Sequence, residues 1–244
     1  MLPDSSSPQK ELRCFWHTAT DAEPDTYVAF RGTFDLTQAT TVEFNILGAA
    51  WFVVWLDGTL FTEGPARFSP SNPEYQTYRV RLETGRHVLA VQVHHLGVTT
   101  RILNDVTPFF WCIARADGEE VEVQWKAQSL EGYTPQVSRI NAQLGWIEWC
   151  DTRQVPQWQP VDYDDSQWSS PHLVTRALGE MKPLSTDNTQ FFVQAASPVA
   201  QGKLAEIFGY EKDNPSARFF CATSHPFTCR LKVSGGATIW VAFA

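Results

Sequence analysis

The stretch AWFVVWLDG, residues 50–58, decides how the fold is interpreted. A strand on the surface of a small sheet alternates apolar and polar residues, but here apolar side chains stand on both faces. The two sets are Phe52, Val54 and Leu56 on one face, and Trp51, Val53 and Trp55 on the other. The Asp57-Gly58 pair that follows predicts a tight turn. The stretch therefore predicts a β-strand with both faces covered.

Further runs with β-strand character lie on both sides of this stretch. They are TYVAFRGTFDL (26–36), TVEFNIL (41–47), TYRVRLE (77–83), HVLAVQVHHL (87–96), PFFWCIARA (108–116) and EEVEVQWKA (119–127). In TVEFNIL, Val42, Phe44 and Ile46 share one face, which is typical of a half-buried antiparallel strand. No long helical periodicity occurs before Thr175. The sequence therefore predicts an all-β fold, an antiparallel β-sandwich with the Phe52 set in its core.

The chain is expected to divide into four parts. They are a flexible tail over 1–13, a jelly-roll β-sandwich over 14–177, a linker over 178–216 and a β segment over 217–244. The linker contains the best helical pattern of the chain, residues 198–211, which Gly202 weakens. The last part is interpreted either as the start of a truncated second β-domain or as strands that complete the first.

Composition excludes several classes of protein. A net charge of −8 argues against a nucleic-acid partner, because phosphate binding needs clustered Lys and Arg. No apolar run is long enough to predict a membrane span. The start of the chain shows no secretory signal, and the five cysteines have no disulfide-framework spacing, so a cytoplasmic location is expected.

Several segments together resemble one enzyme family. They are CFWHTATDAEPDTYVAFRGTFDL, WFVVWLDGTLFTEGPARFSP, GRHVLAVQVHHLG, INAQLGWIEWCDTR and WQPVDYDDSQW. Their order is similar to the N-terminal region of the bacterial α-L-rhamnosidase-type glycoside hydrolases, over about residues 14 to 176. The resemblance implies a jelly-roll, galactose-binding-like sandwich placed ahead of an (α/α)-barrel that carries the catalytic carboxylates. That barrel is then the expected partner, with rhamnose-containing glycans as the ligand class.

No catalytic residue is predicted in this chain. Hydrolysis of a glycoside needs two carboxyl groups that face each other, and nothing in the sequence indicates that any two converge. The candidates by residue type are Glu63, Glu148, Asp164 and Asp165. The DYDDSQW segment is interpreted as turn and capping residues over a core tryptophan, Trp168.

No metal and no cofactor is predicted. His94 and His95 are adjacent, so on a strand they face opposite sides and cannot share a metal ion. Cys221, His225 and Cys229 have a spacing that suggests zinc, but Pro226 and the flanking β-like runs favour a hairpin instead. A Cys221–Cys229 disulfide would require an oxidising compartment.

Tryptophans supply two further hypotheses. Aromatic rings stack on sugars, and the predicted carbohydrate-binding residues are Trp111, Trp146, Trp149 and Trp158. Trp51, Val53 and Trp55 are predicted to form a domain-docking surface, covered by the C-terminal segment or by a neighbouring domain.

The leading hypothesis is a non-catalytic accessory region of an α-L-rhamnosidase-like enzyme. The alternatives are an autonomous carbohydrate-binding module and a complete glycosidase.

Overall fold

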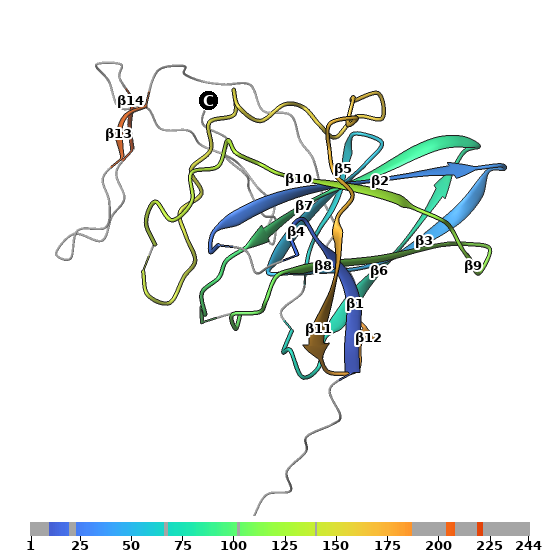
Figure 1. The fold of residues 1–244 in the computed structure, drawn as a ribbon, viewed down its shortest axis with the longest axis horizontal. Coiled ribbons are helices and arrows are strands. Elements are labelled where there is room, and N and C mark those ends of the chain that lie inside the picture. The colour runs from blue at the N-terminus through green and yellow to red at the C-terminus, as the bar shows by residue number, and fades with distance from the viewer. Residues whose placement is uncertain are drawn as a thin grey trace, which may run out of the picture. The chain divides into compact units, whose positions relative to one another are not determined.

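The structure is a computed structural model. It describes residues 10–19, 23–65, 68–101, 103–139, 141–186, 204–207 and 219–221. The chain divides into two compact units, Met1–Gln190 and Phe191–Ala244. Within the described residues the elements are all β-strands, and those of the first unit form two large sheets (Figure 1). This confirms the predicted all-β sandwich.

One sheet has seven strands. Its order is β11, β1, β8, β3, β6 and β12, with β9 paired to β8. The strands are β1 (Lys10–Trp16), β3 (Thr40–Ala49), β6 (Glu74–Leu82), β8 (Phe109–Ala116), β9 (Glu119–Glu120), β11 (His172–Leu178) and β12 (Lys182–Pro183). Neighbouring strands are antiparallel except β12, which pairs parallel to β6.

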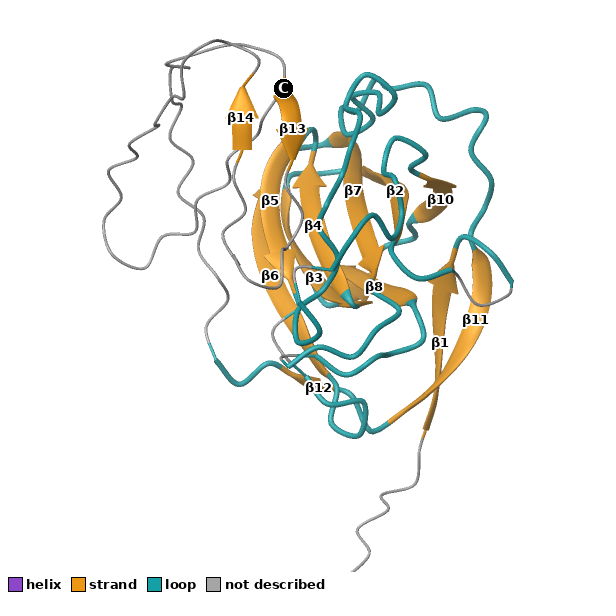
Figure 2. Cartoon of the chain, turned by 90° about the vertical axis from the view of Figure 1, so that its left-hand side faces the viewer, coloured by secondary structure: helices purple, strands orange, loops and turns teal. Residues whose placement is uncertain are grey.

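The other sheet has five strands, which lie side by side in the order β10, β2, β7, β4 and β5 (Figure 2). They are β2 (Thr26–Leu36), β4 (Trp51–Leu56), β5 (Thr59–Gly64), β7 (Gly85–His95) and β10 (Gln124–Ser129). All their pairings are antiparallel. The remaining pair of the described chain lies in the second unit, where β13 (Leu204–Ile207) runs antiparallel to β14 (Phe219–Cys221).

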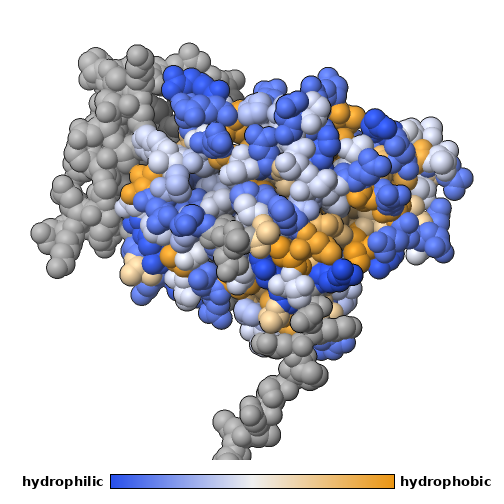
Figure 3. Space-filling model, in the orientation of Figure 1, coloured by the Kyte–Doolittle hydropathy of each residue, from blue (hydrophilic) through white to orange (hydrophobic). Residues whose placement is uncertain are grey.

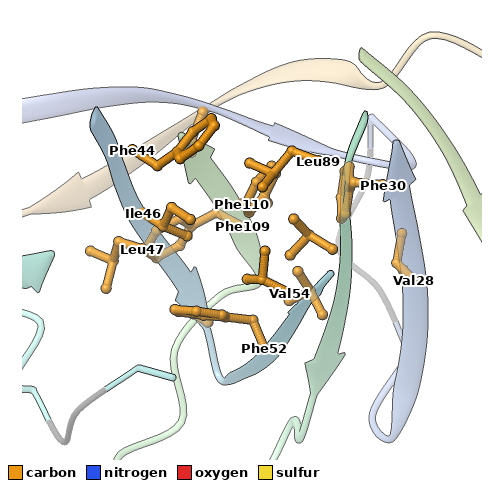
Figure 4. Packing of buried hydrophobic residues seen from close by; sticks show 14 of the residues in the cluster. Val28, Phe30, Phe44, Ile46, Leu47, Phe52, Val54, Leu89, Phe109 and Phe110 are labelled. Carbon is orange, nitrogen blue, oxygen red and sulfur yellow. The ribbon is translucent and has the colours of Figure 1, made fainter. Parts of the chain in front are cut away.

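The core lies between the two large sheets (Figure 4). Phe52 and Val54 are fully buried there, and Leu56 is 8% exposed, so the inward face of β4 is the predicted one. The facing sheet contributes Phe44 and Ile46, both fully buried. Burying a large apolar side chain stabilises a fold by about 1.5–3 kcal/mol. The packing of these side chains between the two sheets therefore holds the sheets together.

Strands extend the sandwich beyond its predicted bounds of 14 and 177. β1 begins at Lys10, inside the predicted tail, because it pairs with β11 along its whole length. β12 lies inside the predicted linker, where Lys182 pairs with Glu74. Residues so far apart in sequence leave no local pattern that reveals their pairing. Of the helix predicted at 198–211 only 204–207 is described, and it forms β13; the rest lies outside the described residues.

The Asp57-Gly58 turn does more than join β4 to β5. Both residues have positive φ, 50° and 81°, as the predicted hairpin turn requires. The Asp57 carboxylate accepts a hydrogen bond from the Val88 backbone N–H at 2.8 Å and lies 2.7 Å from Nδ1 of His87. The turn is therefore tied to β7.

The pH dependence of stability should report this contact. Burial lowers the pKa of His87, but the hydrogen bonds to Asp57 and to the Glu83 carbonyl outweigh it and raise the pKa above 6.5. A raised pKa means that the contribution is complete below about pH 6.5 and is lost as pH rises through the folded-state pKa. Urea unfolding from pH 5.5 to 8.5 should show a larger loss in the native protein than in His87→Gln. Parallel curves would contradict the contact.

Candidate functional site on the outer face of the five-stranded sheet

The outer face of the five-stranded sheet carries three cross-strand rows, given by the register of its strands. The first row is Tyr27, His94 and Trp51; the second is Gln128, Ala29, Gln92, Val53 and Glu63; the third is Lys126, Arg31, Ala90, Trp55 and Leu60. Side chains directly opposite each other in an antiparallel sheet lie about 4.5–5.5 Å apart. Residues far apart in sequence therefore share one surface.

A single segment of the chain covers most of this face. We call residues 130–168 the strap; it follows β10 and leads back towards β11 (Figure 1). Trp158 of the strap is fully buried and packs edge to face against Trp55, with the two ring centroids 5.5 Å apart. Trp168 packs beside Trp158 at 5.9 Å. The strap thus gives the outer face a hydrophobic core of its own, which explains why β4 is apolar on both sides.

A buried arginine fastens the strap to the sheet. The Arg31 side chain is 1% exposed, and its Nε donates a hydrogen bond to the Asp165 carboxylate at 2.8 Å. It also donates to the carbonyls of Trp158 and Pro160. Lys126 reaches the same carboxylate at 2.8 Å. Burial raises the pKa of Asp165, but the hydrogen bonds from Lys126 and Arg31 outweigh it and lower the pKa.

The His94 end of the face is also held in place. Nε2 of His94 lies 2.8 Å from the carboxylate of Asp25, which is 2% exposed and also accepts the Gln136 backbone N–H at 2.5 Å. The Tyr27 ring is stacked on two rings. Its centroid lies 3.9 Å from that of His94 and 3.8 Å from that of Tyr133 of the strap. His95 points to the other side and is 5% exposed, so the two histidines face opposite ways as predicted.

One corner of the face is left open by the strap. Trp51 is 38% exposed there, and its neighbours Val53, Gln92 and Glu63 are half-buried. Glu148 of the strap lies close enough to His94 and Asp25 for their charges to act on its carboxyl. Burial and the Asp25 charge raise the pKa of Glu148, while His94 lowers it; burial also raises the pKa of Glu63. The corner thus combines the exposed Trp51 indole with the Glu63 carboxyl and the Gln92 amide, while the Glu148 carboxyl lies near His94, which stands opposite Trp51.

The four predicted carbohydrate-binding tryptophans are not brought together. Trp111 lies on the other sheet and packs on Tyr75 at 5.4 Å. Trp146 donates its indole N–H to the Leu96 carbonyl at 2.8 Å. Trp149 is 41% exposed, whereas Trp158 is fully buried. We therefore no longer assign Trp158 to sugar binding, because no ligand can reach its ring.

The predicted docking row is divided by the strap. Trp55 has its cover from Trp158, a part of the strap rather than the C-terminal segment. Trp51 and Val53 stay at the open corner. Gln92, Tyr133 and Asp25 of this face are not among the predicted site residues. Of the three, Gln92 has a visible sequence signal, as a polar residue in the apolar run VLAVQV.

Among the described residues no group of three or more His, Cys, Asp and Glu side chains is arranged to hold a metal ion. The zinc spacing predicted at 221–229 lies outside the described side chains. Cys14, Cys112 and Cys150 form no disulfide within the described residues. The Cys14 thiol donates a hydrogen bond to the Val174 carbonyl, and burial raises its pKa to about 12. No helix long and apolar enough to cross a bilayer is found in the described part of the chain.

Comparison with known proteins supports the fold. No protein-family model matches the sequence, and no curated protein matches it. A GH78 family rhamnosidase of Bacillus sp. GL1 is similar in structure, with a TM-score of 0.61 and 21% sequence identity. An α-L-rhamnosidase from Dictyoglumus thermophilum gives 0.48 at 13% identity, covering 84% of this chain and 24% of that one. A Pleurotus ostreatus lectin in complex with GalNAc gives 0.44 at 11% identity, covering 73% and 50%.

Of these three structures, the Bacillus protein has the highest TM-score, 0.61, and supports the assignment of the fold. The similarity covers 72% of this chain and 20% of that chain, so this chain corresponds to a small part of it. At this level of identity the likeness concerns the fold. It confirms, at the level of the fold, the resemblance of residues 14 to 176 to a β-sandwich region of α-L-rhamnosidases.

Proposed function

We propose that this chain is a non-catalytic β-sandwich module of a larger α-L-rhamnosidase-like glycoside hydrolase. The observation that carries the proposal is the match of its sandwich to part of the Bacillus rhamnosidase, over 72% of this chain but 20% of the other. The independent resemblance of several sequence segments to the same family supports it. In such an enzyme the module supports the catalytic barrel and helps to admit the substrate.

The surface of the sandwich offers a place for a neighbouring domain. Phe15 on β1 stands opposite Leu173 on the edge strand β11, which is 56% exposed. The Phe15 ring also packs against Trp125 of β10, with the two ring centroids 6.3 Å apart. Figure 3 shows apolar surface gathered in this region, where β10 passes β1 and β8. We assign this patch, rather than the predicted row at Trp51 and Trp55, to contact with the catalytic barrel, because apolar surface of this kind marks protein interfaces.

A second candidate function is that of an autonomous carbohydrate-binding module. The exposed indole of Trp51 favours it, together with the half-buried Glu63, which stands opposite Val53 in the neighbouring cross-strand row. The two functions differ in whether the chain works alone or beside a catalytic domain. They do not differ in the fold.

An activity assay tests the non-catalytic assignment. We expect the purified chain to release no 4-nitrophenol from 4-nitrophenyl α-L-rhamnopyranoside above the rate in buffer. Glycoside hydrolysis needs an acid and a second carboxylate held about 5–9.5 Å apart across the bond, and the carboxylates Asp25, Asp57 and Asp165 already serve structural contacts. Turnover that disappears in both Glu63→Gln and Glu148→Gln would contradict the assignment and favour a complete glycosidase.

The cytoplasmic location is also part of the proposal. Three buried or half-buried cysteines that form no disulfide within the described residues support it, because reduced thiols persist in a reducing compartment. Fractionation of the source cells with an antibody to this chain tests it, and recovery in the culture medium would count against it.

A further inference from the structure

We propose that the open corner at Trp51 binds one uncharged pyranose ring, with the indole as the stacking surface and Gln92, Glu63 and Glu148 as its polar partners. This inference rests on the proposed function and adds to it a ligand class and a place on the molecule. The proposed sugar site does not include the four tryptophans predicted from the sequence, Trp111, Trp146, Trp149 and Trp158.

The size of the corner fits a single sugar ring. Trp51 lies in the first cross-strand row, opposite His94, while Val53 and Gln92 lie opposite each other in the second. Opposite side chains are about 4.5–5.5 Å apart, and residues two apart on one strand are about 7 Å apart. The surface spanned by the four residues therefore matches the face of one pyranose rather than a longer segment of glycan.

The strap explains why this ring, and no other of the face, is open. Tyr27 is covered by Tyr133, and Trp55 is covered by Trp158. Trp51 is the member of the β4 row that the strap leaves 38% exposed. Its neighbour His94 is fixed by Asp25 and by the Tyr27 ring, so the floor beside the indole is rigid. A rigid aromatic platform binds a ligand with little loss of conformational entropy.

The polar groups at the corner offer both a hydrogen-bond donor and hydrogen-bond acceptors, as the hydroxyls of a sugar require. The Tyr133 hydroxyl donates to the amide oxygen of Gln92 at 3.3 Å, so the amide nitrogen is the group of Gln92 left to donate to a ligand. Within the described residues neither the Glu63 nor the Glu148 carboxylate accepts a hydrogen bond. Sugar hydroxyls both donate and accept, so they satisfy an amide N–H and carboxylate oxygens together.

Charge and area favour a sugar over the other occupants. The Glu63 carboxyl in the row next to the indole and the Glu148 carboxyl near His94 repel phosphates and uronates. A stable protein interface buries about 800 Å² on each partner, which one partly exposed indole and one half-buried valine do not supply. An uncharged ring with one apolar face meets both conditions.

Calorimetric titration of the full 244-residue chain tests the proposal. The probes are methyl α-L-rhamnopyranoside and methyl β-D-galactopyranoside, with D-galacturonate as the anionic control. We expect millimolar binding of at least one uncharged glycoside and weaker binding of the uronate. Trp51→Ala should weaken binding about tenfold or more, since the stacking surface is lost, and Trp51→Phe should recover part of it.

Two matched variants separate the site from other tryptophans. Trp149→Ala and Trp111→Ala remove rings outside the corner and should leave the affinity within about twofold; equal unfolding midpoints of all variants show that each is folded. Loss of binding in Trp149→Ala but not in Trp51→Ala would overturn the proposal, as would the absence of binding of every uncharged probe. Neither result bears on the module's place in a larger enzyme, which is tested by activity.

Discussion

Replacing Trp158 with alanine is expected to lower the free energy of unfolding by about 3–5 kcal/mol. The side chain is fully buried between the strap and the sheet, in contact with Trp55 and Trp168, so its removal leaves a cavity that backbone on both sides holds open. Urea unfolding of the native chain and the variant, followed by circular dichroism, gives the difference directly.

Trp149→Ala is the matched control for this change. The same chemical deletion is made in the same strap, but at a side chain that is 41% exposed. It should cost less than about 1 kcal/mol. Equal losses in the two variants would mean that the strap does not cover the sheet and that Trp158 is not its anchor.

Arg31→Met should destabilise the protein by a similar amount, about 3–5 kcal/mol. The substitution keeps an unbranched side chain in the buried position but removes every donor, so the carbonyls of Trp158 and Pro160 lose their partner. The Asp165 carboxylate keeps only Lys126. Breaking one partner of a buried pair is costly because the remaining polar groups are left without water or hydrogen bonds.

The same substitution at Arg86 provides the comparison. Arg86 pairs with Asp35 on the surface, with both side chains 64% exposed, and exposed pairs contribute about 0–1 kcal/mol. The unfolding midpoint of Arg86→Met should therefore lie close to that of the native chain. A small effect at Arg31 as well would show that the strap is held by its aromatic residues alone.

Local patterns in the sequence were sufficient for the central strands and for the direction of their faces. The alternation in β3 and β4 placed Phe44 and Phe52 in the core, where both are fully buried. The Asp57-Gly58 pair predicted a tight turn, and both residues have the positive φ that such a turn requires. These features depend on side-chain spacing along one strand, which the sequence displays.

The strap and its fastening could not be predicted in the same way. Residues 130–168 have no regular periodicity, and the contact that fastens them joins positions more than a hundred residues apart, Arg31 and Asp165. DYDDSQW was interpreted as turn residues over a core tryptophan. Trp168 is indeed buried, but Asp165 has the added role of binding Arg31. An arginine inside the apolar run TYVAFRGTFDL was the one local sign of that pair.

The open corner shows a further limit of reasoning from residue type. Ten tryptophans made sugar binding plausible, but their exposure depends on which of them the strap covers. Trp51 and Trp55 occupy equivalent positions on β4, yet one is at the surface and the other under Trp158. Burial of this kind is decided by tertiary contacts.

The α-L-rhamnosidase activity of the native protein, captured from its source cells with an antibody to this chain, tests the proposed function most directly. We expect the captured protein to exceed the 27.6 kDa of this chain and to hydrolyse 4-nitrophenyl α-L-rhamnopyranoside, while the 244-residue chain alone does not. Capture of an inactive protein of 27.6 kDa, with the activity left in the unbound fraction, would contradict the account and leave the autonomous carbohydrate-binding module in its place.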